Sequence, residues 1–117
     1  MREKEIEQIL VQGIKDLGGV AFKFVSPGND GVPDRLIVMP GGRVCFVELK
    51  TERGRLSGLQ KTQIRRLRTL GQYVAVLYGA SDVRAFLVDM GLGFAWSAMK
   101  AGLWDVEPSG QKGGDAQ

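Results

Sequence analysis

Two apolar runs separated by a turn signal constrain the fold of this chain more than any other feature. Residues 35–39 read Arg-Leu-Ile-Val-Met and residues 44–47 read Val-Cys-Phe-Val, so both runs are rich in β-branched and large apolar side chains. Pro40, Gly41 and Gly42 lie between them, and proline together with glycine is typical of tight turns. The pattern therefore predicts a β-hairpin.

The length of the hairpin loop decides where two carboxylates point. With a three-residue loop at 40–42, Asp34 faces Glu48, and directly opposed residues have Cβ atoms roughly 4.5–5.5 Å apart. A two-residue loop would pair Asp34 with Leu49 instead and turn the two carboxylates to opposite faces of the sheet. The interpretation that follows therefore requires the three-residue register.

The second strand of the hairpin runs directly into Glu48, Leu49 and Lys50. Side chains alternate along a strand, so Glu48 and Lys50 share a face. Two carboxylates near one point repel each other unless a cation lies between them, and a neighbouring lysine can orient or activate a water. Asp34, Glu48 and Lys50 together suggest metal-assisted hydrolysis of a phosphodiester. The alternative is a solvated strand end with a surface Glu–Lys pair, preceded by an ordinary Gly-x-Pro-Asp turn.

Composition excludes several kinds of chemistry. The chain has 117 residues, of which 44% are hydrophobic and 25% charged, as expected of a single globular domain. It contains no histidine, which rules out a Ser-His-Asp triad, a histidine-ligated zinc ion and a histidine base. The single cysteine, Cys45, excludes an intramolecular disulfide and is expected to be a small buried hydrophobe.

Charge is distributed unevenly around the hairpin. The net charge is +3, but nine basic residues and only three acids lie between Asp34 and Arg68. Two of these acids are Asp34 and Glu48 themselves. Such a cationic segment beside the candidate site suits a polyanionic substrate. The nine basic residues are Arg35, Arg43, Lys50, Arg53, Arg55, Lys61, Arg65, Arg66 and Arg68.

The rest of the chain reads as alternating helices and strands. The expected elements are a helix over 3–17, strands over 20–25, 35–39 and 44–50, a helix over 57–70, a strand over 73–78, a helix capped by Ser81 and Asp82 and ending at Met90, and a short apolar helix within 91–106. This α-β-β-β-α-β-α order predicts an α/β fold with a central mixed sheet flanked by helices on both faces. Residues 1–106 would form one domain and residues 107–117 a flexible tail.

Several polar residues on the two long helices are open to two interpretations. Glu3 and Glu7 could point toward a metal at the core edge, or they could complement the helix dipole. Gln60, three residues after Ser57, could be only a helix cap, which its spacing favours, or it could contact nucleic acid or a water on the metal. A basic stripe is formed by Lys61, Arg65 and Arg68. It is either a solvated face or a surface for DNA phosphates, and the adjoining basic loop favours DNA.

The sequence resembles the VRR-NUC family of the PD-(D/E)XK nuclease superfamily, in its small stand-alone, phage-type form. The resemblance extends from about Glu3 to Asp89. It rests on the acidic first helix, Gly31-Val32-Pro33-Asp34, Glu48-Leu49-Lys50, the stretch 51–57, Gln60 and Gly71. The resemblance implies a restriction-endonuclease-like core and cleavage of DNA with Mg²⁺ or Mn²⁺, without a small-molecule cofactor.

The resemblance also implies roles for individual residues. Asp34 and Glu48 would bind the metal, with the backbone carbonyl of Leu49 as a further ligand. Lys50 would position or polarise the attacking water and stabilise the developing negative charge.

Other positions would complete the catalytic and DNA-binding surface. The helix-one acid of the family maps best onto Glu3, with Glu7 second, and its glutamine maps onto Gln60. The phosphate contacts would come from Arg53, Arg55, Lys61, Arg65 and Arg68.

We therefore expect a metal-dependent, structure-selective DNA endonuclease that acts as a homodimer on Holliday junctions or other branched DNA. The alternatives are a nickase or non-specific nuclease, a non-catalytic DNA-binding module, and an RNA-directed nuclease. Candidate dimer surfaces are the apolar segment 94–104 and the exposed parts of the first helix. With no apolar run near the ~20 residues of a membrane span, we expect no membrane partner and a cytoplasmic location, the host cytoplasm if the protein is phage-encoded.

Overall fold

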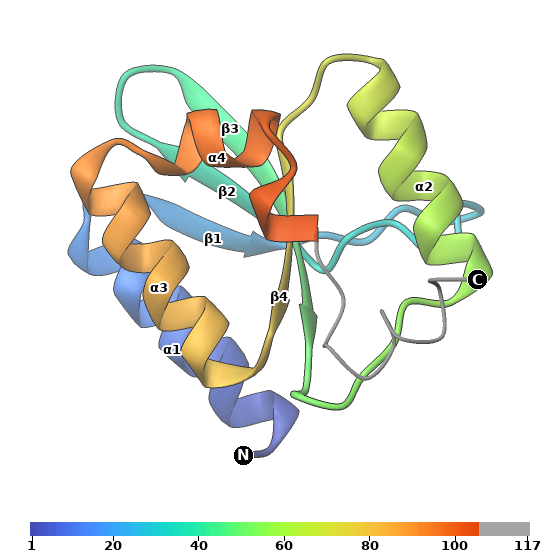
Figure 1. The fold of residues 1–117 in the computed structure, drawn as a ribbon, viewed down its shortest axis with the longest axis horizontal. Helices are drawn as coiled ribbons and strands as arrows, with labels where there is room; N and C mark the ends of the chain where they lie inside the picture. The colour runs from blue at the N-terminus through green and yellow to red at the C-terminus, as the bar shows by residue number, and fades with distance from the viewer. Residues whose placement is uncertain (106–117) are drawn as a thin grey trace.

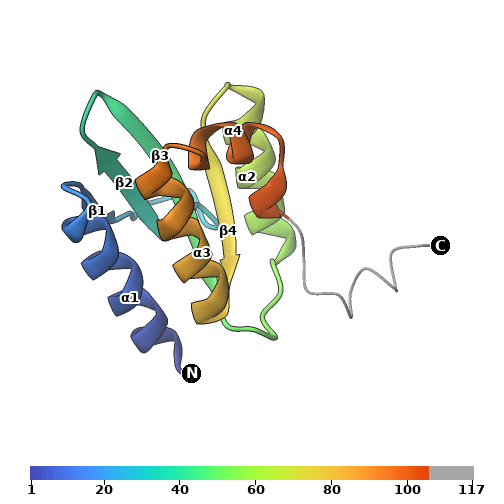
Figure 2. The ribbon, with the colours of Figure 1, turned by 60° about the vertical axis from the view of Figure 1, so that its left-hand side comes forward.

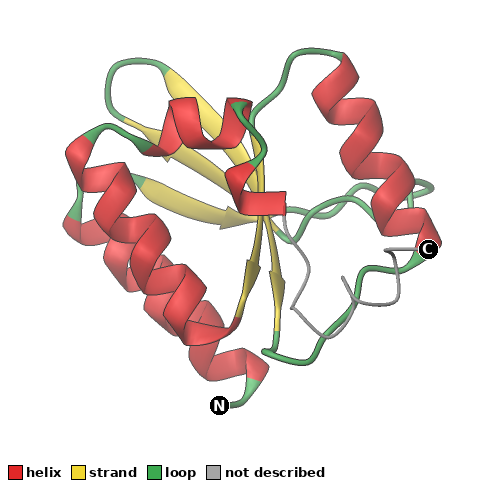
Figure 3. Ribbon diagram, viewed as in Figure 1, coloured by secondary structure: helices red, strands yellow, loops and turns green. Residues whose placement is uncertain are grey.

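The computed structural model describes residues 1–105 of the chain (Figure 1). Figure 3 distinguishes its helices, strands and loops. In chain order the elements are α1 (Glu3–Asp16), β1 (Val20–Lys23), β2 (Arg35–Met39), β3 (Arg43–Lys50), α2 (Gly58–Thr69), β4 (Val74–Tyr78), α3 (Gly79–Leu92), α4 (Ala95–Lys100) and the 3₁₀ turn η1 (Leu103–Asp105). The predicted order of helices and strands is therefore confirmed through α3. The expected tail over 107–117 lies outside the described residues.

The four strands form one mixed sheet in the spatial order β1-β2-β3-β4. The pairs β1–β2 and β2–β3 are antiparallel, as hairpin-connected strands require. β3 and β4 are parallel, and α2 is the helix that connects them. Because parallel neighbours run in one direction, the polar end of β3 lies beside the end of β4.

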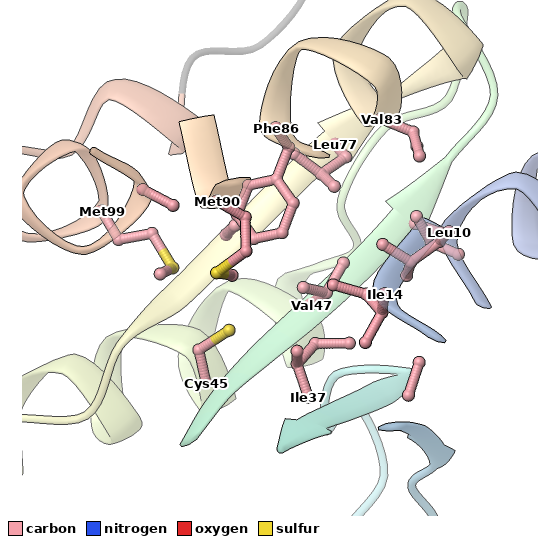
Figure 4. Packing of buried hydrophobic residues seen from close by; sticks show 14 of the residues in the cluster. Leu10, Ile14, Ile37, Cys45, Val47, Leu77, Val83, Phe86, Met90 and Met99 are labelled. Carbon is pink, nitrogen blue, oxygen red and sulfur yellow. The ribbon is translucent and has the colours of Figure 1, made fainter. Parts of the chain in front are cut away.

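One face of the sheet is covered by α1, α3 and α4, which Figure 2 shows on the same side of the strands. α1 buries Ile6, Leu10 and Ile14, which are spaced at one helical turn, against the sheet and α3. Figure 4 shows this core, in which Cys45 and Val47 of the central strand are buried beneath the helices. Cys45 is thus the small buried hydrophobe that the sequence predicts, and burial raises the pKa of its thiol to about 12.

Among the helices of residues 1–105, α2 alone lies on the opposite face. Ile64 and the half-buried Leu67 of this helix pack on Val74 and Val76 of β4, and Phe46 of β3 joins the cluster. Figure 1 shows α2 standing well away from β1 and β2. Helices therefore lie on both faces of the sheet, as predicted, but the second face is only partly covered.

Two helix starts test the caps that the sequence predicts. At α2, Ser57 Oγ accepts a hydrogen bond from the Gln60 N–H (3.1 Å) and Gln60 Oε1 accepts one from the Ser57 N–H (2.8 Å), so the predicted capping box is confirmed. At α3 the prediction is wrong, because the helix begins at Gly79 rather than after Ser81 and Asp82. Asp82 lies inside the first turn, where its Oδ2 accepts a hydrogen bond from the Tyr78 N–H (2.9 Å).

The remaining differences from the prediction are at element ends. α1 stops at Asp16, β1 stops at Lys23 rather than Val25, β4 begins at Val74, and α3 continues to Leu92. Such shifts of one or two residues are usual where elements fray. None of the helices formed by residues 1–105 combines the length and apolar character needed to cross a membrane.

Candidate active site

The register of the β2–β3 hairpin is the one that the sequence predicts for a three-residue loop. Met39 pairs with Arg43, and at the other end of the ladder Arg35 pairs with Val47. The next opposed positions are Asp34 and Glu48. The two carboxylates consequently share one face of the sheet, the face that carries α2.

Asp34 lies at the end of a loop and is held by backbone groups of its neighbours. Its Oδ2 accepts a hydrogen bond from the Leu49 N–H (3.0 Å). Its own carbonyl accepts one from the Phe24 N–H (2.8 Å), which continues the β1–β2 pairing by one residue. The preceding Pro33 is buried, which restricts the position of the chain where Asp34 leads into β2.

Glu48 is the single charged side chain that is buried among residues 1–105, with 2% of its surface exposed. Its Oε2 accepts a hydrogen bond from Gln60 Nε2 (3.0 Å) and lies 3.7 Å from Lys50 Nζ. Burial, assisted by the nearby Asp34 charge, raises the pKa of Glu48 to about 8, and Lys50 opposes both effects. This environment disfavours the ionised form of the carboxyl group, and a cation that binds there stabilises that form.

One buried oxygen atom of this site lacks a hydrogen-bond partner among the described residues. Glu48 Oε1 is buried and has no hydrogen-bond partner within the described chain. A buried acceptor left unpaired is costly, so such an atom calls for a water or an ion as its partner. With Asp34 beside it, the donor set consists of hard carboxylate oxygens, which Mg²⁺ and Mn²⁺ prefer. The residues present therefore fit a divalent ion.

The candidate metal site has few protein carboxylates. Within residues 1–105, no cluster of three or more potential metal-ligating acids, cysteines or histidines is present. That composition is compatible with Mg²⁺, which is usually held by one or two carboxylates together with waters and substrate phosphates.

Gln60 caps α2, as its spacing favours, and it also contacts the candidate metal ligand Glu48. Its Oε1 belongs to the capping box with Ser57, and its Nε2 donates to Glu48. Because the amide oxygen is occupied by the Ser57 N–H, the amide nitrogen necessarily faces the carboxylate. The cap of α2 thereby fixes the orientation of a buried acid in β3.

The sequence alone does not show why residue 31 must be a glycine. This residue has φ +91°, and a β-carbon there would lie 2.7 Å from the carbonyl carbon of Leu59 and 2.8 Å from its oxygen. The loop before Asp34 thus touches the backbone of the first turn of α2. Gln63 Nε2 also donates to the Asp30 carbonyl (3.3 Å). The Gly-x-Pro-Asp spacing indicates a turn, but it carries no signal for this distant contact.

The two acids of α1 are not part of the cluster. Glu7 Oε1 forms an ion pair with Arg35 Nη2 (3.2 Å). Arg35 pairs with Val47, so this ion pair lies on the face of the sheet opposite to Glu48. Glu3 is exposed at the start of α1. The structure brings neither acid together with Asp34 and Glu48.

The predicted phosphate contacts fall into two groups. Arg53, Arg55, Lys61 and Arg65 are exposed on the loop after β3 and on α2. Arg68 differs, because it is half-buried near the C-terminal end of α2 and its Nη2 donates to the Val74 carbonyl (3.0 Å). The predicted basic stripe is therefore continuous only through Arg65.

A mixed sheet with helices on both faces, and with two carboxylates and a lysine at the ends of neighbouring strands, is the arrangement of the PD-(D/E)XK class. Residues 3–81 match the VRR-NUC domain family. The chain belongs to this family of nucleases.

Two relatives agree with this assignment. A protein of Acyrthosiphon pisum secondary endosymbiont phage 1 named "Putative nuclease p44" is 46% identical over 77 residues, covering 66% of this chain and 83% of the relative. A solved structure described as a "VRR_NUC domain" matches with a TM-score of 0.70 at 28% sequence identity, covering 74% of this chain and 94% of the other.

Proposed function

We propose that this protein is a metal-dependent DNA endonuclease selective for branched structures, acting as a homodimer on Holliday junctions. The observation that carries the metal-dependent chemistry is the buried Oε1 of Glu48, which lacks a partner within residues 1–105 and lies beside a second carboxylate and a lysine. The name of the phage relative, "Putative nuclease p44", supports the reaction class.

Asp34 and Glu48 would hold Mg²⁺ or Mn²⁺, with the Leu49 carbonyl as a further ligand. A divalent ion bound there would supply Lewis-acid stabilisation of the charge that develops on the phosphate. The Leu49 N–H keeps Asp34 in position, and Gln60 occupies Oε2 of Glu48 so that Oε1 remains available. The chain itself thus orients both carboxylates before any ion arrives.

Lys50 would act on the attacking water. Its ammonium group lies 3.7 Å from Glu48 Oε2 and is largely shielded from solvent. From this place it can donate a hydrogen bond to the water that approaches the phosphorus and stabilise negative charge in the transition state. The acids of α1, Glu3 and Glu7, would take part only if DNA binding moved the start of that helix.

The DNA phosphates would be bound by Arg53, Arg55, Lys61 and Arg65. These side chains reach solvent from the loop and helix that adjoin Glu48. Arg68 would contribute through the position of α2, since its guanidinium donates to the Val74 carbonyl.

The requirement for two copies follows from the number of sites. Each chain contributes one pair of opposed carboxylates, Asp34 and Glu48, and one such site cuts one strand. Resolution of a four-way junction needs two symmetric cuts, which a two-fold dimer supplies.

The decisive experiment compares cleavage of four-way junction, flap and linear duplex DNA in Mg²⁺, Mn²⁺ or EDTA. Lys50→Ala is the test variant, and Lys15→Ala, on the exposed side of α1, is the matched control. We expect symmetric, metal-dependent junction cuts that disappear in Lys50→Ala and persist in Lys15→Ala. Equal cutting of every substrate would leave a nickase or non-specific nuclease, and tight binding without cutting would indicate a non-catalytic module.

A further inference from the structure

On the side of α2, the part of the sheet face formed by β1, β2 and the start of β3 is apolar, and no helix formed by residues 1–105 covers it. Val20 and Phe22 of β1 are 48% and 53% exposed, and Val44 of β3 is 41% exposed. Leu36 and Val38 of β2 lie between them on the same face, half-buried. These five residues are called the open sheet face below. A contiguous exposed apolar surface of this kind usually marks an interaction site.

The open sheet face exists because α2 covers only β3 and β4. In Figures 1 and 2, α1 and α3 lie on the other side of the sheet, and no helix crosses β1 and β2 on the side of α2. Antiparallel sheets that face water on one side normally carry polar residues there. Here the water-facing positions are aliphatic or aromatic instead.

This surface adjoins the active site. Phe22 pairs with Leu36, and Leu36 pairs with Phe46. The next row of the same face contains Phe24, Asp34 and Glu48, since the Phe24 N–H bonds to the Asp34 carbonyl. Whatever covers the open sheet face therefore comes to lie directly beside the catalytic carboxylates.

The chemistry of this surface narrows the choice of partner. It contains no cation, whereas the exposed arginines and lysines that suit DNA lie on α2 and on the loop before it. Residues 106–117 read Val-Glu-Pro-Ser-Gly-Gln-Lys-Gly-Gly-Asp-Ala-Gln, with Val106 as the one aliphatic side chain larger than alanine. This composition offers few apolar side chains to match those of the open sheet face.

We propose that the open sheet face binds the same face of a second copy of this chain. The inference rests on the proposed two-site nuclease and assigns its partner surface. An uncharged sheet face is complementary to itself, so two copies related by a two-fold axis can pack face to face as the layers of a β-sandwich do. The net charge of +3 on each chain produces a long-range repulsion that salt screens, and no charged side chain belongs to the face itself.

The arrangement has a functional consequence. Each copy would carry its Asp34 and Glu48 at the border of one shared interface, one row from Phe22 of the same chain. Two cuts could then be made on one bound junction. The competing dimer surfaces are the segment 94–104, where Phe94 and Leu103 are 59% and 65% exposed, and the first helix.

The test measures self-association of the full chain by sedimentation velocity over a range of concentrations. Phe22→Thr/Val44→Thr removes apolar surface while keeping residues that favour strands. Val88→Gln/Leu92→Gln is the matched control, because these α3 side chains are 60% and 62% exposed on the other side of the molecule. We expect a dimer for the wild type and the control, and a dissociation constant raised by about 30-fold or more in the sheet variant.

Circular dichroism and thermal unfolding establish that both variants are folded. A sheet variant that associates like the wild type would overturn the inference and leave the proposed dimeric nuclease standing with another interface. A wild type that is monomeric at every concentration would also overturn it, and junction-selective cutting by that monomer would show separately whether the substrate assignment survives. Protection of the open sheet face from hydrogen exchange only when DNA is added would identify it as a DNA contact instead.

Discussion

Among single residues, Gly31 has the least obvious connection to the chemistry. It carries no side chain that could bind a metal ion or a phosphate. Its lack of a side chain allows the loop before Asp34 to lie against the backbone of Leu59, one residue before Gln60. Since Gln60 donates to Glu48, the distance between loop and helix sets how the two acids are placed relative to each other.

Gly31→Ala is therefore expected to weaken Mn²⁺ binding. The added methyl group has to displace either the loop or the first turn of α2, and disturbing the groups that support metal ligands typically costs about 10- to 100-fold in affinity. Gly28→Ala is the matched control, because Gly28 lies in the same loop with φ +82° and a β-carbon added there would have nothing within 4 Å. Both variants carry the backbone strain of a non-glycine residue at positive φ, roughly 1–2 kcal/mol.

Isothermal titration of the two full-length variants with Mn²⁺ separates strain from contact. If Gly31→Ala binds Mn²⁺ as tightly as Gly28→Ala, the contact with Leu59 has no part in organising the site. Thermal unfolding of both variants gives the structural cost independently.

At the scale of elements, local patterns are sufficient for the hairpin. The turn signal at 40–42 limits the hairpin to a two- or a three-residue loop, and the structure has the three-residue register, which brings Asp34 and Glu48 to one face. The capping box at Ser57 is equally predictable, because its partners are three residues apart. The hairpin and the cap depend on near neighbours in the chain, so the sequence predicts both, although it leaves the length of the hairpin loop open.

Contacts between distant elements cannot be predicted in this way. Gln60 and Glu48 are twelve residues apart, and a cap is by itself a complete explanation of the glutamine. Glu7 and Arg35 are 28 residues apart, and an acid in a first helical turn gives no indication of which face of a sheet its partner occupies. The predicted start of α3 is wrong because Ser81 and Asp82 match a cap pattern, while the chain turns at Gly79, which has φ +80°.

The basic stripe of α2 allows a test of which of its residues contact DNA phosphates. Lys61→Gln/Arg65→Gln is expected to reduce the slope of log affinity against log salt for DNA by roughly 1–2, because each lost phosphate contact removes about 0.9 from the slope. Arg68→Gln should leave the slope unchanged and instead cost about 1–2 kcal/mol of stability, since its hydrogen bond to the Val74 carbonyl is lost. Fluorescence anisotropy with one duplex at several salt concentrations measures the slopes, and urea unfolding measures the stability.

The opposite pattern would contradict the structural division of these residues. An Arg68→Gln protein with normal stability and a reduced slope would mean that this guanidinium reaches phosphate after all. An unchanged slope in Lys61→Gln/Arg65→Gln would remove α2 from the DNA surface.

For the whole molecule, the burial of Glu48 in the candidate active site opposes folding. The described core is apolar apart from Glu48, whose burial raises its pKa to about 8 from a usual 4.5. A carboxyl group with a raised pKa keeps its proton in the folded state after the unfolded chain has lost it. The free energy of unfolding must then fall as the pH rises through this window. The metal-free protein is accordingly destabilised by the group that the proposed chemistry needs in ionised form.

The prediction is that in EDTA the free energy of unfolding declines between pH 4.5 and about 8, with a contribution from Glu48 of up to ~1.4 kcal/mol per pH unit. Glu48→Gln should remove most of this decline, because an amide does not titrate. Saturating Mn²⁺ should reverse the decline in the wild type but not in the variant, since metal ions bind deprotonated ligands and stabilise only the folded state. Urea unfolding at a series of pH values, with and without Mn²⁺, measures all four curves. Glu52→Gln, at an exposed position in the loop after β3, should retain the wild-type slope. A metal-free Glu48→Gln protein whose stability declines as steeply as the wild type would show that burial of this carboxylate is not what opposes folding.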